Sequence, residues 1–212
     1  MMTACEAGHS QIIDLILDGV EQNVRRELVT YTCETGSVIH ACVANQKSPV
    51  ETMQHLINRL EMIAEDEVEP DFVEETVNKK DKSGIHSLFL AVFQGNYDLC
   101  KLLIEHGGAD PMQASDPNKV TLLHICAERG YEKLTELLCS VAPKMVFEAD
   151  LEGNTPLHVV CDWDYAEIVK TFCDTIDAEL AKQSGADGNK AAAMQDADSD
   201  QSDHENEDSS LI

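Results

Sequence analysis

The chain has 212 residues, of which 43% are hydrophobic and only 5% aromatic, so it can form a folded core but has few aromatics for a β-sheet protein. Its 40 acidic residues outnumber 15 basic ones, which gives a net charge of -25 at pH 7. Nucleic acids and anionic membranes are bound through Lys and Arg, so this charge argues against both as direct ligands and favours a protein partner with a basic segment.

The N-terminus has neither the basic flank nor the apolar run of a secretory signal, and no apolar stretch approaches the length of a membrane span. The sequence therefore predicts a cytoplasmic or nuclear chain without membrane insertion. The eight cysteines include no Cys-x-x-Cys pair and no second pair at zinc spacing. We expect reduced thiols and no metal or cofactor.

The first third of the chain contains two incomplete copies of a helical unit. Residues 4–17 carry apolar side chains at helical spacing, and residues 20–28 suggest one or two further helical turns. A second copy covers residues 36–57 and contains His40. Residues 61–75 then hold eight carboxylates and no basic residue. We interpret the acidic region near 61–77 as an insertion between two copies.

Three clear copies follow, at residues 81–104, 116–139 and 150–173. They open with Asp81, Asp116 and Asp150, which are 35 and 34 residues apart. Each copy begins with a turn and continues with two short stretches whose apolar residues fall at helical spacing. A fixed period of this length predicts a stack of helix-turn-helix units.

The last copy contains the tetrapeptide Thr155-Pro156-Leu157-His158, and Thr121 and His124 occupy the matching places one copy earlier. This recurring motif resembles the signature of the ankyrin-repeat family, and residues 105–111 resemble that family's turn after the second helix. The resemblance covers residues 1 to about 183. It implies an all-α solenoid of about five stacked units, monomeric and not an enzyme.

The motif residues have structural roles. Thr caps the first helix, Pro suits its first turn, and His can form hydrogen bonds across adjoining turns. These structural positions are His40, Thr121, His124, Thr155, Pro156 and His158. In the third copy His86 replaces the Thr and Phe89 replaces the His, so we expect the polar network to be missing there.

The cysteines recur at fixed places in the repeat, which is typical of small buried hydrophobic residues. On this basis we expect Cys161 and Cys173 to be buried like Cys42 and Cys126. A His and a Cys two or three residues apart on one helix point to different faces, so they form no nucleophile pair. No phosphate-binding loop, nucleophile elbow or His-Glu-x-x-His motif occurs.

From residue 184 the composition becomes polar and acidic, and we predict a disordered tail over 184–212. Residues 196–207 place acidic side chains at the spacing of a calcium loop. However, Gln201 stands where that loop requires Gly. We therefore interpret this segment as a solvated acidic run and predict no calcium site.

The resemblance implies that the turns and first helices together form a concave binding surface, as solenoids use. We call the following twelve residues the partner face. They are Lys82, Ile85, Phe93, Gln94, Asn118, Val120, Glu128, Arg129, Glu152, Asn154, Asp162 and Trp163. Trp163, the only Trp, is either an interface anchor or part of the packing at the end of the stack.

Three functions fit this organisation. The first is an adaptor or scaffold that binds one protein through the partner face. The second is an inhibitor loosely similar to the IκB type, which masks a basic segment of a transcription factor. The third is the cytosolic ankyrin part of a larger protein such as a channel.

Overall fold

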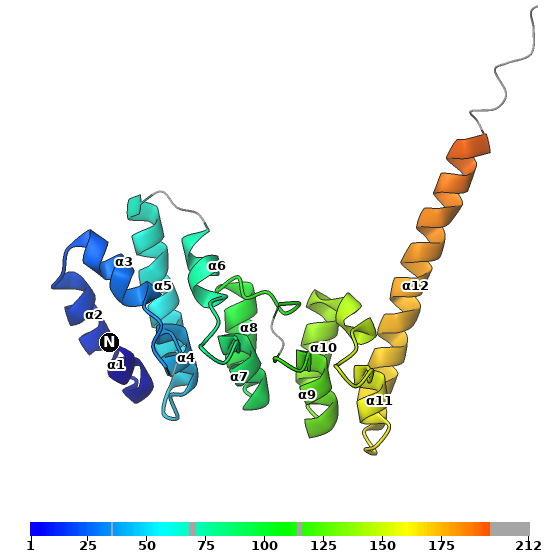
Figure 1. Cartoon of the computed structure of the whole chain (residues 1–212), viewed down its shortest axis with the longest axis horizontal. Coiled ribbons are helices and arrows are strands. Elements are labelled where there is room, and N and C mark those ends of the chain that lie inside the picture. Colours follow the sequence, from blue (N-terminus) through cyan, green and yellow to red (C-terminus); the bar gives the residue numbers. More distant parts are fainter. Residues whose placement is uncertain (35, 68–70, 114–115, 196–212) are drawn as a thin grey trace, which may run out of the picture.

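The computed structural model describes residues 1–34, 36–67, 71–113 and 116–195. Its helices stand side by side in one row, with the N-terminus at one end and the longest helix at the other (Figure 1). Within the described residues there are no β-strands, only two isolated bridges. The predicted all-α repeat architecture is therefore confirmed.

Most elements are the first and second helices of a repeat, and further helices lie between some of the repeats. In chain order they are α1 Met2–Ala7, α2 Ser10–Asp18, α3 Gln22–Thr30, α4 Val38–Val43, α5 Pro49–Glu67, α6 Phe72–Val77, α7 Ser87–Phe93, α8 Tyr97–Glu105, α9 Leu122–Arg129, α10 Glu132–Val141, the 3-10 helix η1 Pro143–Phe147, α11 Pro156–Val160 and α12 Ala166–Gln195.

The first helices are short, and neighbours cover them on almost every side. In α9 the first six residues, Leu122 to Ala127, are all buried. The second helices are amphipathic: α8 buries Leu99 and Leu103 and exposes Lys101. One continuous hydrophobic core runs from α1 to α12 as each unit covers the next.

The acidic insertion near 61–77 has a definite structure on both sides of residues 68–70, which lie outside the described part. It lengthens α5 to 19 residues and adds the short helix α6. Asn78, just after α6, donates a side-chain hydrogen bond to the Gly108 carbonyl and accepts one from the Asp110 N–H, both at 2.9 Å. The insertion is thereby tied to the turn that follows α8.

The last helix is longer than the sequence indicates. We predicted a disordered tail from residue 184, whereas α12 continues to Gln195. Residues 196–212, including the calcium-like spacing, lie outside the described residues. The nature of that segment stays a prediction.

The cysteine prediction is wrong at two positions. Cys42 and Cys126 are buried, but Cys161 and Cys173 are exposed. Both exposed thiols belong to the last repeat, and in the described part of the chain no further helix pair covers it. No disulfide joins any of the eight cysteines.

Candidate protein-binding surface

Each of the three clear repeats opens with a turn that is held by its Asp. The Asp116 carboxylate accepts hydrogen bonds from the backbone N–H groups of Asn118 and Val120 at 2.9 and 2.8 Å. Asp81 and Asp150 make the same pair of bonds in their own turns. Backbone hydrogen bonds to the carboxylate, above all from Asn154, lower the pKa of Asp150. Each turn is thus held by hydrogen bonds among its own residues.

The motif histidines join neighbouring repeats. The Thr121 N–H donates to His124 Nδ1 at 3.1 Å, so Nε2 carries the ring hydrogen and donates to the Asn154 carbonyl of the next turn at 2.9 Å. His40 repeats this arrangement between Ser37 and the Ile85 carbonyl. His158 keeps only the local half, to Thr155, and its ring is exposed.

The third copy departs from this network. Phe89 is buried in the place of the His. The Nδ1 atom of His86, in the place of the Thr, is buried without a hydrogen-bond partner within the described residues. Burial, followed by the positive charge of Lys80, lowers the pKa of His86, so the ring is held neutral.

The turn residues of the partner face divide into tips and supports. Lys82, Asn118 and Glu152 are exposed at the tips, whereas Ile85, Val120 and Asn154 are half-buried. The half-buried residues support the stack, because the carbonyls of Ile85 and Asn154 receive the histidine hydrogen bonds. Among these six turn residues, the three tip side chains are the most open to a partner.

The first-helix residues of the partner face form a row of exposed side chains. All six are exposed, and they lie at or just after the ends of α7, α9 and α11. The guanidinium carbon of Arg129 lies 4.5 Å from the centre of the Phe93 ring, a cation–π contact between adjacent repeats. Phe93 is nevertheless 48% exposed, so one side of this pair remains open.

Trp163 lies at the end of this row and is held from one side. Its ring stacks on Tyr165, with centroids 6.4 Å apart and an interplanar angle of 16°. Tyr165 in turn packs against Gly130 of the preceding repeat. Trp163 is still 50% exposed, so the end of the stack covers its ring only in part.

We expect Gly130→Ala to destabilise the protein more than Gly153→Ala. Both glycines have positive φ, 72° and 87°, so each substitution costs about 1–2 kcal/mol of backbone strain. A Cβ at Gly130 would also lie 2.7 Å from the Tyr165 ring, whereas one at Gly153 would meet nothing within 4 Å. The clash adds about 1–3 kcal/mol, measurable by urea denaturation. Equal losses would mean that Tyr165 does not pack there.

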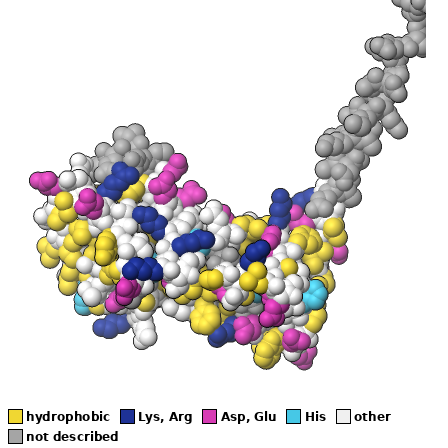
Figure 2. All heavy atoms as spheres, in the orientation of Figure 1, with side chains coloured by type: hydrophobic (Ala, Val, Ile, Leu, Met, Phe, Trp, Pro, Cys, Tyr) yellow, Lys and Arg dark blue, Asp and Glu magenta, His cyan; other side chains and the backbone are white. Residues whose placement is uncertain are grey.

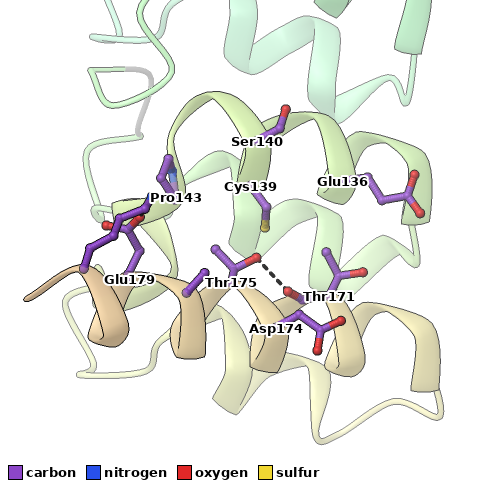
Figure 3. Close-up of a pocket in the computed structure, with 10 residues that line it drawn as sticks. Glu136, Cys139, Ser140, Pro143, Thr171, Asp174, Thr175 and Glu179 are labelled. Carbon is purple, nitrogen blue, oxygen red and sulfur yellow. Dashed lines mark hydrogen bonds and ion pairs between the residues drawn. The ribbon is translucent and has the colours of Figure 1, made fainter. Parts of the chain in front are cut away.

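A second concave feature is a groove of about 470 Å³ between α10 and α12 (Figure 3). Cys139 of α10 and Thr175 of α12 line the groove from opposite helices. The Thr175 hydroxyl donates a hydrogen bond to the Thr171 carbonyl at 2.7 Å. Glu179 is buried and forms an ion pair with Lys182. Burial raises the pKa of the Cys139 thiol, so it is protonated at neutral pH and is a poor nucleophile.

The described residues contain no group of three or more His, Cys, Asp or Glu side chains that could hold a metal ion. None of the helices in the described segments is long and apolar enough to cross a membrane.

A family model described as ankyrin repeats in three copies matches residues 1–115 and 88–184. The chain therefore belongs to the ankyrin-repeat family.

Two characterised proteins are similar to part of the chain. Protein phosphatase 1 regulatory subunit 27 of Homo sapiens is 34% identical over 93 residues, which are 44% of this chain and 58% of the relative. The target of rapamycin complex 2 subunit AVO2 of Saccharomyces cerevisiae is 27% identical over 88 residues, 42% of this chain and 21% of the relative. The matched segment thus spans less than two thirds of either relative.

Sequence reasoning missed two supports of the surface. The stacking of Arg129 on Phe93 crosses a repeat boundary, and the only signal for it is that each residue ends a first helix. The contact of Tyr165 with Gly130 was also missed. The sequence feature that indicates it is the recurrence of a Gly and a Tyr in the same places of two repeats. Gly95 and Tyr131 make the same contact one repeat earlier.

Proposed function

We propose that the chain is an adaptor or regulatory subunit that holds a partner protein against the partner face. One observation carries the proposal. Two stacked pairs, Phe93 with Arg129 and Trp163 with Tyr165, lie at or shortly after the ends of successive first helices. The side chains of Phe93, Arg129 and Trp163 are exposed. Trp, Tyr and Arg dominate the binding energy of protein interfaces, particularly where they are held rigidly before binding.

The relatives support this class of function. One is named as a subunit of a complex and the other as a regulatory subunit of a phosphatase. Both names describe proteins that act within an assembly. The repeat family gives the same expectation, since a solenoid presents an extended surface and the motif histidines here are engaged in holding the stack.

Of the two alternatives, the inhibitor that masks a basic segment is supported by the negative charge of the last repeat. The described residues offer no observation that favours a channel fragment.

The proposal is tested by affinity capture with the full chain and two triple variants. In the first, Phe93, Arg129 and Trp163 are replaced by Ala. In the control, Val141, Phe147 and Lys101 are replaced by Ala; these are two exposed apolar residues and one cation on α10, η1 and α8. All six side chains are exposed, so both variants should keep the thermal midpoint nearly unchanged.

We expect the wild-type chain and the control to retain the same interacting protein, and the first variant to bind it at least about tenfold more weakly, since anchor residues contribute about 2 kcal/mol or more each. Loss of binding in both variants, or in neither, would contradict a partner site at this face.

A further inference from the structure

We propose that the partner segment docked at the end of the stack is basic, and that an arginine side chain of this segment stacks on the open side of Trp163 between Asp162 and Asp164. This inference rests on the proposed function and specifies the chemistry of the partner. It follows from the charge of the last repeat, from the way Trp163 is held and from a contact that the chain already makes within itself.

Charge is distributed unevenly along the stack. Residues 78–119 contain five acidic and five basic residues and are therefore neutral. Residues 148–182, the last turn and helix pair, contain nine acidic and two basic residues. Figure 2 shows Asp and Glu side chains at the lower right end of the molecule and again at its upper left, while Lys and Arg side chains lie across its middle and at the upper right. A basic partner is the electrostatic complement of this end.

The exposed aromatic surface at that end is in place before any partner binds. Tyr165 is wedged against Gly130 and supports the ring of Trp163. Asp162 and Asp164 precede and follow the Trp in the chain, and both are exposed. A planar cation on the open side of this ring would therefore meet the negative face of an indole together with nearby carboxylates.

The neighbouring repeat contains an intramolecular version of the same contact. Arg129 and Trp163 occupy equivalent places, 34 residues apart, and Arg129 stacks on Phe93 of the repeat before it. Since indole is a better cation–π acceptor than a phenyl ring, an arginine from outside can do on Trp163 what Arg129 does on Phe93. Arginine suits the site better than lysine because its planar head can stack while binding carboxylates.

The experiment uses the fact that Trp163 is the only Trp in the chain. Its fluorescence therefore reports on this site alone when the full chain is titrated with a peptide that lacks aromatic residues. The probe is a short peptide of alternating glycine and arginine, compared with the same peptide carrying neutral citrulline in place of arginine. We expect a saturable change in emission with the arginine peptide and at least about tenfold weaker binding of the citrulline peptide.

Two double variants separate local from overall electrostatics. Asp162→Asn with Asp164→Asn removes the two flanking charges. Glu6→Gln with Glu61→Gln removes the same charge from exposed residues on α1 and α5, far along the stack. We expect the first variant to bind the arginine peptide about tenfold more weakly and with less dependence on salt, while the second stays within about twofold of the wild type.

Equal binding by the two double variants, equal binding of the citrulline peptide, or binding that leaves Trp163 emission unchanged would each overturn the inference. These outcomes are distinguishable from failure of the proposed function. If the arginine peptide fails but capture still depends on Phe93, Arg129 and Trp163, only the basic character of the partner is refuted. If capture is independent of those residues, the partner face itself is refuted.

Discussion

His124→Ala is expected to lower the free energy of unfolding by about 3 kcal/mol, because the residue holds two repeats together. The ring is almost wholly buried and bridges two repeats, accepting from Thr121 and donating to the Asn154 carbonyl. Its removal leaves buried polar groups without partners, at about 1–3 kcal/mol for each that water cannot reach. Urea denaturation followed by circular dichroism measures the loss.

His158→Ala is the matched control. It has the same motif position and the same bonds to Thr155, but its ring is exposed and bridges to no further repeat among the described residues. We expect a loss of about 1 kcal/mol or less, the usual worth of a helix cap. Similar losses for the two variants would show that the bridge to the next turn contributes little.

Phe172→Ala is expected to cost about 3–5 kcal/mol, the range for removing a buried aromatic ring from a core. Phe172 is fully buried in α12, which packs on α10, η1 and α11. The cavity would loosen the last helix from the stack. Thermal and urea unfolding should both report the change.

Leu180→Ala, on the same helix, provides the comparison because Leu180 is 51% exposed. We expect its effect to stay within about 0.5 kcal/mol, as for most surface substitutions. A large effect at Leu180, or a small one at Phe172, would mean that α12 packs on the stack through a different side from the one described.

Much of the fold could be predicted from the sequence because its signals are local. The Asp that opens each turn accepts from backbone groups two and four residues on. The motif His acts within its own cap and reaches one repeat ahead. Such contacts recur with the period, so the period alone reveals them. The absence of the histidine hydrogen bonds in the third copy could also be predicted, because Phe89 occupies the place of the His.

The rest depended on contacts that break the period. The exposure of Cys161 and Cys173 follows from their place in the last repeat, since the equivalent residues one repeat earlier, Ala127 and Cys139, are buried. The extent of α12 past residue 184 was missed because polar, small residues carry no amphipathic pattern. The pairing of Arg129 with Phe93 joins two exposed side chains, for which hydrophobic periodicity gives no signal.

The claim that a partner lies on the partner face is tested most directly by hydrogen–deuterium exchange of the full chain, alone and with the captured protein. We predict slower exchange in the turns and at the ends of the first helices, over residues 81–95, 116–131 and 150–165, with the second helices α8 and α10 unchanged. Protection confined to α8 and α10, with those three segments exchanging as in the free chain, would contradict the account.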